Sequence, residues 1–218
     1  MLNKALFLLA LAGAALPARA DIVVKDDTGR EVRLKGPAKR IISLAPHVTE
    51  TLYAAGAGPA LVGAVDYSDY PEAARKLPRV GGYSRLDLEA IAALKPDLLI
   101  AWESGNAPAN IEKLRALGLA VFVVQPNAMD DVARQLTQFG HLAGSEAVAE
   151  PAAARFRDKL ASLRAKYSGK SPVRVFYQIW KQPLMTVGGP QIIRSAIRLC
   201  GGENVFAKID QMSPTVSQ

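Results

Sequence analysis

The sequence predicts an α/β fold with a parallel sheet. Three short apolar runs, at residues 41–44, 61–65 and 98–101, have the composition of buried strands and alternate with segments of helical periodicity. Polar or aromatic residues follow the carboxyl ends of these runs, where open α/β sheets bind ligands. The surrounding stretch, residues 40–102, contains no recognisable catalytic motif. We therefore expect a lobe that holds a molecule without changing it.

The elements around these runs follow in the order that such a lobe requires. Residues 21–36 alternate and contain a D-D-T-G turn, which predicts a β-hairpin covering an edge of the sheet. Pro46 is suited to the first turn of the helix that follows the first strand. The remaining elements expected in a lobe at residues 21–144 are helices at 87–95, 109–117 and 130–143 and a strand at 120–124.

A long, charged, alanine-rich helix is expected at residues 145–168. About 20 helical residues span roughly 30 Å, the diameter of a domain. Such a helix is either a rigid connector between two lobes or an ordinary packing helix, and its periodicity leaves both open. Residues 169–218 then supply about one strand (173–180) and one helix (191–200). Because these cannot bury a sheet on both faces, we expect a second α/β lobe that is truncated in this chain.

The first twenty residues have the pattern of a cleavable secretion signal. Lys4 supplies a positive charge, residues 5–16 are apolar, and residues 18–20 form an A-x-A cleavage site. The run of about 12 apolar residues is shorter than the ~20 that a membrane-spanning helix needs. We expect a mature chain that begins at Asp21 in the periplasm.

Composition argues against nucleic acid as a partner. The net charge is +7, but the basic residues are scattered instead of forming a patch interleaved with aromatic residues. Cys200 is the only cysteine, so no internal disulfide can form. It ends an apolar helix and is expected to be a small buried hydrophobic residue. We expect a monomer.

The chain lacks the usual catalytic motifs. It has no G-x-S-x-G, P-loop, H-E-x-x-H or C-x-x-C sequence, so we expect no catalytic residues, no metal site and no enzyme activity. His47 falls in the first turn of a helix just past a strand end and can face a ligand cleft. His141 falls late in a helix and is expected at the surface.

Large aromatic residues are the stronger sign of a binding site. Tyr67, Trp102 and Trp180 each fall at or just past the carboxyl end of an expected strand, and Tyr83 falls in a glycine-rich loop. Aromatic rings at the mouth of a cleft combine apolar area with a polar tip. They indicate a bulky, partly polar ligand.

Several runs of sequence, in order, resemble periplasmic cobalamin-binding proteins. These belong to the substrate-binding proteins with a helical backbone that serve ABC importers. The resemblance covers nearly all of residues 38–218. The runs are RIISLAPHVTETLYAAGA, VGAVDYSDYP, DLEAIAALKPDLLIAW, RVFYQIW, MTVGG and LCGGENVF.

The resemblance implies two α/β lobes joined by one long helix, with cobalamin or a related corrinoid held between them as a transported ligand, not a cofactor. Aromatic residues line the cleft in this family. Tyr67, Trp102 and Tyr83 match such positions, although Tyr83 stands where a family member has tryptophan. In the second lobe Trp180 and Met185 match a segment that reaches the ligand, and Met185 stands where that relative has an aromatic residue.

The resemblance also implies a protein partner. Members of the family dock to the permease dimer of an ABC importer through one surface glutamate on each lobe. Glu89 matches the glutamate of the first lobe, and its position about 100° from Leu88 on the helix places it toward solvent. Taken without the resemblance, Glu89 is an acid favoured by the helix dipole.

Two alternatives to a corrinoid receptor stay open. One is a haem, iron-siderophore or metal binding protein of the same superfamily. For haem, Tyr67 and His47 are the axial-ligand candidates of the first lobe. The other is an α/β enzyme of the cell envelope. The lack of a nucleophile–base pair argues against the enzyme.

Overall fold

The computed structural model describes residues 21–217 and shows an α/β fold built on a parallel sheet. The expected secretion signal, residues 1–20, lies outside the described residues. None of the helices within residues 21–217 is long and apolar enough to cross a membrane.

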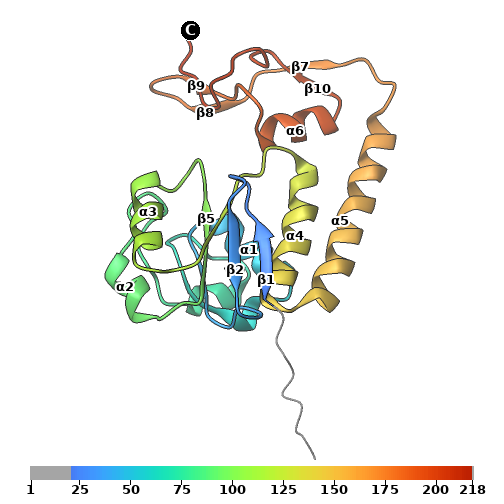
Figure 1. Ribbon diagram of the computed structural model, residues 1–218. Helices are drawn as coiled ribbons and strands as arrows, with labels where there is room; N and C mark the ends of the chain where they lie inside the picture. Colours follow the sequence, from blue (N-terminus) through green and yellow to red (C-terminus); the bar gives the residue numbers. More distant parts are fainter. Residues whose placement is uncertain (1–20, 218) are drawn as a thin grey trace, which may run out of the picture.

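Four parallel strands form the main sheet in the order β4-β3-β5-β6 (Figure 1). They are β3 (Ile41–Ser43), β4 (Leu61–Ala64), β5 (Leu98–Trp102) and β6 (Val121–Val124). The strand β4 pairs with one side of β3, and β5, which comes later in the chain, pairs with the other side. The strand β6 then pairs with β5. This reversal of the strand order creates a topological switch point between β3 and β5, where open α/β sheets form a crevice beyond the carboxyl ends of the strands.

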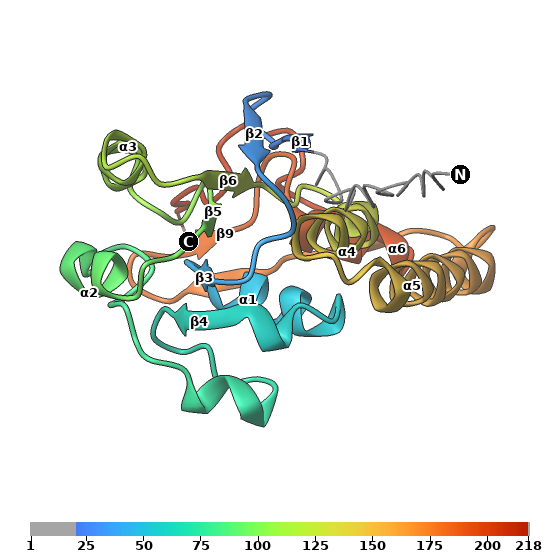
Figure 2. The same ribbon diagram turned by 60° about the horizontal axis from the view of Figure 1, so that its bottom comes forward.

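Helices cover both faces of this sheet. Figures 1 and 2 show α2 (Leu88–Ala93) and α3 (Pro108–Ala116) on one side, and α4 (Met129–Ala143) and α5 (Glu146–Tyr167) on the other. The helix α1 (Pro46–Ala54) packs on the same face as α4. Two short 3-10 helices, Gly58–Ala60 and Glu72–Lys76, flank β4.

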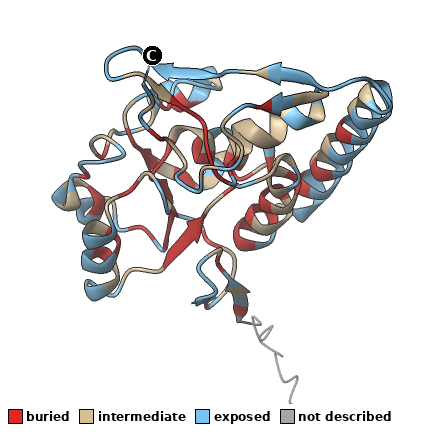
Figure 3. Cartoon of the chain, turned by 90° about the horizontal axis from the view of Figure 1, so that it is seen from above, coloured by how far each residue is buried: buried red, intermediate tan, exposed pale blue. Residues whose placement is uncertain are grey.

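The alternation of side chains along each strand creates two separate hydrophobic cores. Ile41 belongs to the core under α1 and α4, whereas its neighbour Ile42 belongs to the core under α2 and α3. Leu98 and Leu99 of β5 divide in the same way. In Figure 3 the buried residues are concentrated in the central strands, and the exposed residues cover the outer surfaces of the helices. Burial on both faces explains why the strands are continuous apolar runs.

The N-terminal hairpin protects the edge strand β6. It consists of β1 (Ile22–Lys25) and β2 (Glu31–Leu34). Its turn contacts β6 through the carboxylate of Asp26, which accepts a hydrogen bond from the backbone N–H of Val123 at 3.3 Å. The same carboxylate accepts from the backbone N–H of Thr28 at 3.0 Å and forms an ion pair with Arg115 at 3.4 Å. The backbone N–H of Asp27 donates to the carbonyl of Val123 at 2.9 Å. The expected hairpin is therefore present and satisfies groups at an otherwise open edge.

The helices α4 and α5 form a closely packed pair. Gly144 ends α4 in the left-handed conformation, with φ of 68°, and lets the chain reverse into α5. A Cβ atom placed on Gly140 would lie 2.2 Å from the Cβ of Ala149, so the two backbones approach as closely as glycine allows. The long helix expected at 145–168 is thus anchored along α4, and its later turns rise beyond the sheet (Figure 1).

Residues 169–217 lie across the carboxyl edge of the sheet (Figure 1). Their strand β7 pairs parallel with β10, and β8 pairs antiparallel with β9. The single strand predicted at 173–180 is therefore wrong, because its two halves belong to different pairs. Cys200, predicted to be buried, is exposed at the end of α6. The elements are β7 (Val173–Val175), β8 (Gln178–Trp180), β9 (Met185–Thr186), α6 (Ile192–Leu199) and β10 (Gly202–Asn204).

Candidate functional site

A cavity of about 710 Å³ lies between the carboxyl edge of the sheet and residues 169–217. Its size is typical of a small-molecule site. One wall comes from α1, the end of β5 and α4, and the other comes from the β8 region, α6 and residues 211–213. The lining residues are His47, Thr51, Trp102, Ser104, Gln125, Pro126, Val132, Gln135, Tyr177, Gln178, Ile179, Gln191, Ile192, Ile193, Gln211, Met212 and Ser213.

His47 and Trp102 meet at the switch point of the sheet. His47 stands in the first turn of α1, which follows β3, and Trp102 ends β5. Their rings lie 5.1 Å apart at 84°, an edge-to-face contact. The ring of Tyr83 lies 6.2 Å from that of Trp102. Three of the residues expected at the site are therefore neighbours, and two of them line the cavity.

Gly105 makes room for the indole of Trp102. A Cβ atom at this position would lie 1.9 Å from Cε3 of Trp102. Any other residue at position 105 would force either the loop or the indole to move. The glycine thus fixes where the aromatic ring stands at the cavity wall.

Asn106, which the sequence analysis did not single out, joins three segments at this edge of the sheet. It is 1% exposed. Its Nδ2 donates to the carbonyl of Leu44 at 2.9 Å and to that of Tyr83 at 2.6 Å. Its Oδ1 accepts from the backbone N–H of Trp102 at 2.7 Å. A buried carboxamide with every partner on backbone is a strong positional constraint. Two of the partners, Leu44 and Tyr83, are distant in sequence and could not be predicted from it.

A row of buried hydroxyl groups holds the loop that carries Tyr67. The Oγ1 of Thr49 lies 2.8 Å from the Oγ of Ser43 and 3.0 Å from the Oγ of Ser68. Ser68 is 1% exposed, whereas the preceding Tyr67 is 78% exposed and has φ of 64°. The left-handed backbone is unusual for a bulky residue, and it turns the tyrosine side chain out of the loop.

The other expected site residues do not border the cavity. Tyr67 and Tyr83 are exposed, and the ring of Tyr83 lies beside that of Trp102. Trp180 is exposed, and its Nε1 donates to the carbonyl of Gln182 at 3.0 Å. Met185 lies in β9. In the same segment Tyr177 borders the cavity instead, and the break between β7 and β8 at residues 176–177 is what places it there.

Burial keeps the imidazole of His47 neutral. It lowers the pKa of His47 from 6.5 to about 4. The Nε2 atom has no hydrogen-bond partner among the described residues. The side chain is therefore an uncharged group with one buried, unpartnered ring nitrogen.

Among residues 21–217, no group of three or more His, Cys, Asp or Glu side chains is placed to hold a metal ion.

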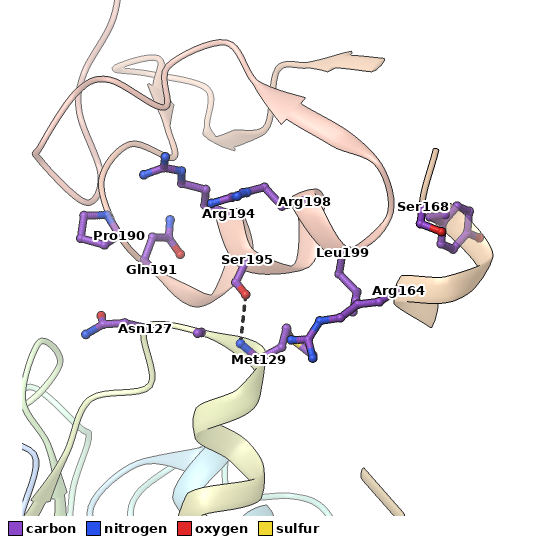
Figure 4. A pocket seen from close by; sticks show the side chains of 12 residues that line it. Asn127, Met129, Arg164, Ser168, Pro190, Gln191, Arg194, Ser195, Arg198 and Leu199 are labelled. Carbon is purple, nitrogen blue, oxygen red and sulfur yellow. Dashed lines mark hydrogen bonds between the residues drawn. The ribbon is translucent and has the colours of Figure 1, made fainter. Parts of the chain in front are cut away.

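A second hollow, of about 480 Å³, lies where α4, α5 and α6 meet (Figure 4). The hydroxyl of Ser195 accepts from the backbone N–H of Met129 at 3.1 Å, and thereby caps the start of α4. Arg164 forms an ion pair with Asp130. These contacts connect the helices, and they position α6 beside the main cavity.

The sequence matches the family model described as periplasmic binding protein over residues 41–218. The chain belongs to this family. A vitamin B12-binding protein of Vibrio cholerae is 42% identical over 181 residues, and one of Yersinia pestis is 41% identical over 181 residues. The alignments cover 83% of this chain and 66% and 65% of those relatives, so the chain spans about two thirds of their length. The family is one of binding proteins.

Solved structures of the family share the fold. The periplasmic vitamin B12-binding protein BtuF of Vibrio cholerae superposes with a TM-score of 0.79 at 42% identity, over 83% of this chain and 71% of that one. The periplasmic heme-binding protein RhuT of Roseiflexus gives 0.70 at 26% identity over the same shares. The identity to the first structure is much higher.

We predict that Asn106→Ala lowers the free energy of unfolding by about 3 kcal/mol, because it leaves buried backbone groups on three segments without partners. Urea unfolding followed by fluorescence measures the change. Asn127→Ala, at an exposed position, is the matched control and should cost less than about 0.5 kcal/mol. Equal losses for the two variants would contradict the role given to Asn106.

We predict that His47 makes stability fall as the pH is lowered from 7.5 to 5. The unfolded chain has the higher pKa and binds more protons in this window, so the folded state loses about 2 kcal/mol relative to it. Urea unfolding of the wild type and of His47→Gln at both pH values isolates this contribution from that of the carboxylates. The prediction fails if both proteins lose the same stability.

Proposed function

We propose that this protein is a periplasmic receptor that captures cobalamin or a related corrinoid and delivers it to an ABC importer. The observation that carries the proposal is the cavity at the switch point of the sheet, with Trp102 on one wall and Tyr177 on the other. The 42% identity to a vitamin B12-binding protein supports this ligand class. A bulky macrocycle suits aromatic walls because its apolar faces can pack against the rings.

We further propose an arrangement of two lobes, at residues 21–144 and 169–218, joined by the helix at 145–168. The close contact between Gly140 and Ala149 supports a rigid connection between the helix and the first lobe. A rigid connector would let the protein bind without a large hinge movement.

The ligand-contact residues of this proposal fall into two groups. His47 and Trp102 line the cavity. Tyr67, Tyr83 and Trp180 are exposed, which leaves their rings free to contact the part of a large ligand that protrudes. Met185, in the short strand β9 that pairs with β8, completes the set.

Haem is the second candidate ligand. One observation favours it, since the neutral imidazole of His47 has an unpartnered Nε2 and is a suitable axial ligand for iron.

We predict that the purified full chain binds cyanocobalamin in a calorimetric titration and that Trp102→Ala weakens binding by about tenfold, the equivalent of about 1.4 kcal/mol of lost aromatic contact. A parallel titration with haemin, followed in the visible spectrum, tests the second candidate. A shifted Soret band with haemin and no heat with cyanocobalamin would replace the first candidate by the second.

We propose that Glu89 docks the protein to the permease dimer of the importer. Glu89 is exposed in the first turn of α2. Asp87 caps this helix by accepting from the backbone N–H of Ala90 at 2.9 Å, so the glutamate is not needed as the cap. Ile91 is fully buried and fixes which face of α2 is outward.

We predict that Glu89→Arg leaves ligand affinity unchanged and lowers transport at least tenfold, because it reverses the charge of an interface contact. Uptake of labelled ligand by vesicles containing the transporter measures this effect. Glu150→Arg makes the same charge change at an exposed site on α5 and should transport normally. Normal uptake with Glu89→Arg would refute the docking role.

A further inference from the structure

The wall of the main cavity is uncharged. Within the part of the chain that the structure describes, the residues that line the cavity include no Asp, Glu, Lys or Arg. Burial keeps the only histidine among them, His47, neutral at ordinary pH by lowering its pKa to about 4. The polar character of the wall comes instead from hydroxyl groups and from five glutamines: Gln125, Gln135, Gln178, Gln191 and Gln211.

Gln135 is the glutamine that the protein itself leaves unsatisfied. It is 1% exposed, and its Nε2 has no hydrogen-bond partner in the described structure. Gln125 and Gln191 differ, because their Oε1 atoms accept from the backbone N–H groups of Ser104 and Ile193 at 3.1 Å each. A buried amide donor without a partner is costly. A ligand carbonyl in the cavity would satisfy it.

His47 is a second residue of the cavity wall with an unsatisfied nitrogen. Its Nε2 is buried without a partner. The two unpartnered atoms belong to residues of different helices, α1 and α4, and both residues line the cavity. Both groups are neutral, so they match neutral hydrogen-bonding groups better than ionised ones.

Three arginines line the second hollow and, among the described residues, none lines the main cavity. They are Arg164, Arg194 and Arg198, around α6 (Figure 4). Arg164 is paired with Asp130, and Arg194 donates to the carbonyl of Gly189 at 3.4 Å. A carboxylate that entered the main cavity would lose water without gaining a guanidinium or ammonium group at its wall. Such an ion is strongly disfavoured in a desolvated site.

We propose that the main cavity selects its ligand by charge. It accepts a macrocycle whose peripheral groups are neutral carboxamides and discriminates against the same macrocycle when a carboxamide is replaced by a carboxylate. Gln135 donates a hydrogen bond to a ligand carbonyl and is a specificity-determining residue of this site. This inference rests on the proposed corrinoid function and adds to it a physical basis for selection.

The test compares ligands that differ in one charge. The full chain is titrated by calorimetry with cyanocobalamin, with monocarboxylates made from it by hydrolysis of one propionamide, and with their neutral methyl esters. We expect the carboxylates to bind at least tenfold more weakly at pH 7.5 and the esters to recover most of the loss. Monocarboxylates that all bind within twofold of cyanocobalamin would overturn the inference and leave the corrinoid function standing. A complete lack of cyanocobalamin binding would overturn both.

Variants test the residues independently of the ligand series. Gln135→Leu should weaken cyanocobalamin binding about tenfold, and an unchanged affinity would overturn the role of Gln135. Gln178→Arg adds a cation at an exposed position of the cavity wall and should bring the carboxylates to within about threefold of cyanocobalamin, whereas the uncharged control Gln178→Met should not. If Gln178→Met shifts the ratio equally, charge is not the cause and the inference fails. The wild-type ligand series decides the question even if Gln135→Leu does not fold.

Discussion

The side-chain amide of Asn106 is the constraint on which the binding edge of this protein depends. Its three hydrogen bonds reach the carbonyl of Leu44 after β3, the carbonyl of Tyr83 before α2 and the backbone N–H of Trp102 at the end of β5. These segments are separated by tens of residues in sequence but meet at the switch point of the sheet. Because the amide is buried, water cannot replace any of these bonds without exposing the edge. The positions of the Tyr83 and Trp102 backbones therefore depend on one side chain.

Several residues of the motifs that the chain shares with its family hold the backbone at the carboxyl edge of the sheet. In the Y-S-D-Y-P run Ser68 is buried in a row of hydroxyl groups with Thr49 and Ser43, and the two tyrosines beside it are exposed. Gly105 similarly leaves the space that the Trp102 indole occupies. The buried small and polar residues fix the backbone, and the exposed aromatic residues are carried by it. Two proteins that share such a motif therefore share the backbone geometry at the carboxyl edge of the sheet, and the motif is weaker evidence that they share a ligand.

The parts of the fold that sequence could predict are those governed by local periodicity. Apolar runs gave the four parallel strands to within a residue or two at each end, and spacing on α2 placed Glu89 outward. The parts that it could not predict depend on long-range partners. The strand predicted at 173–180 is divided into β7, which pairs with β10, and β8, which pairs with β9. Asn106 and Gln135 have no local signature, since a buried amide in a loop or on a helix looks like any exposed one until the surrounding segments are in place.

The distribution of charge connects the scaffold to the ligand site. Several ion pairs in the described residues join two elements, as between Asp26 of the hairpin turn and Arg115 of α3, or between Asp130 of α4 and Arg164 of α5. At the cavity wall, glutamines and a neutral histidine stand instead. Each neutral hydrogen bond contributes modestly to the binding free energy. A desolvated charged hydrogen bond contributes more, but a buried charge that lacks its partner is strongly destabilising. A receptor that must hold a large ligand and then give it up gains from many weak neutral contacts. In the proposed complex the aromatic rings would supply area without charge and the unpartnered amide of Gln135 would supply direction, so selectivity need not come from an ion pair that would slow release.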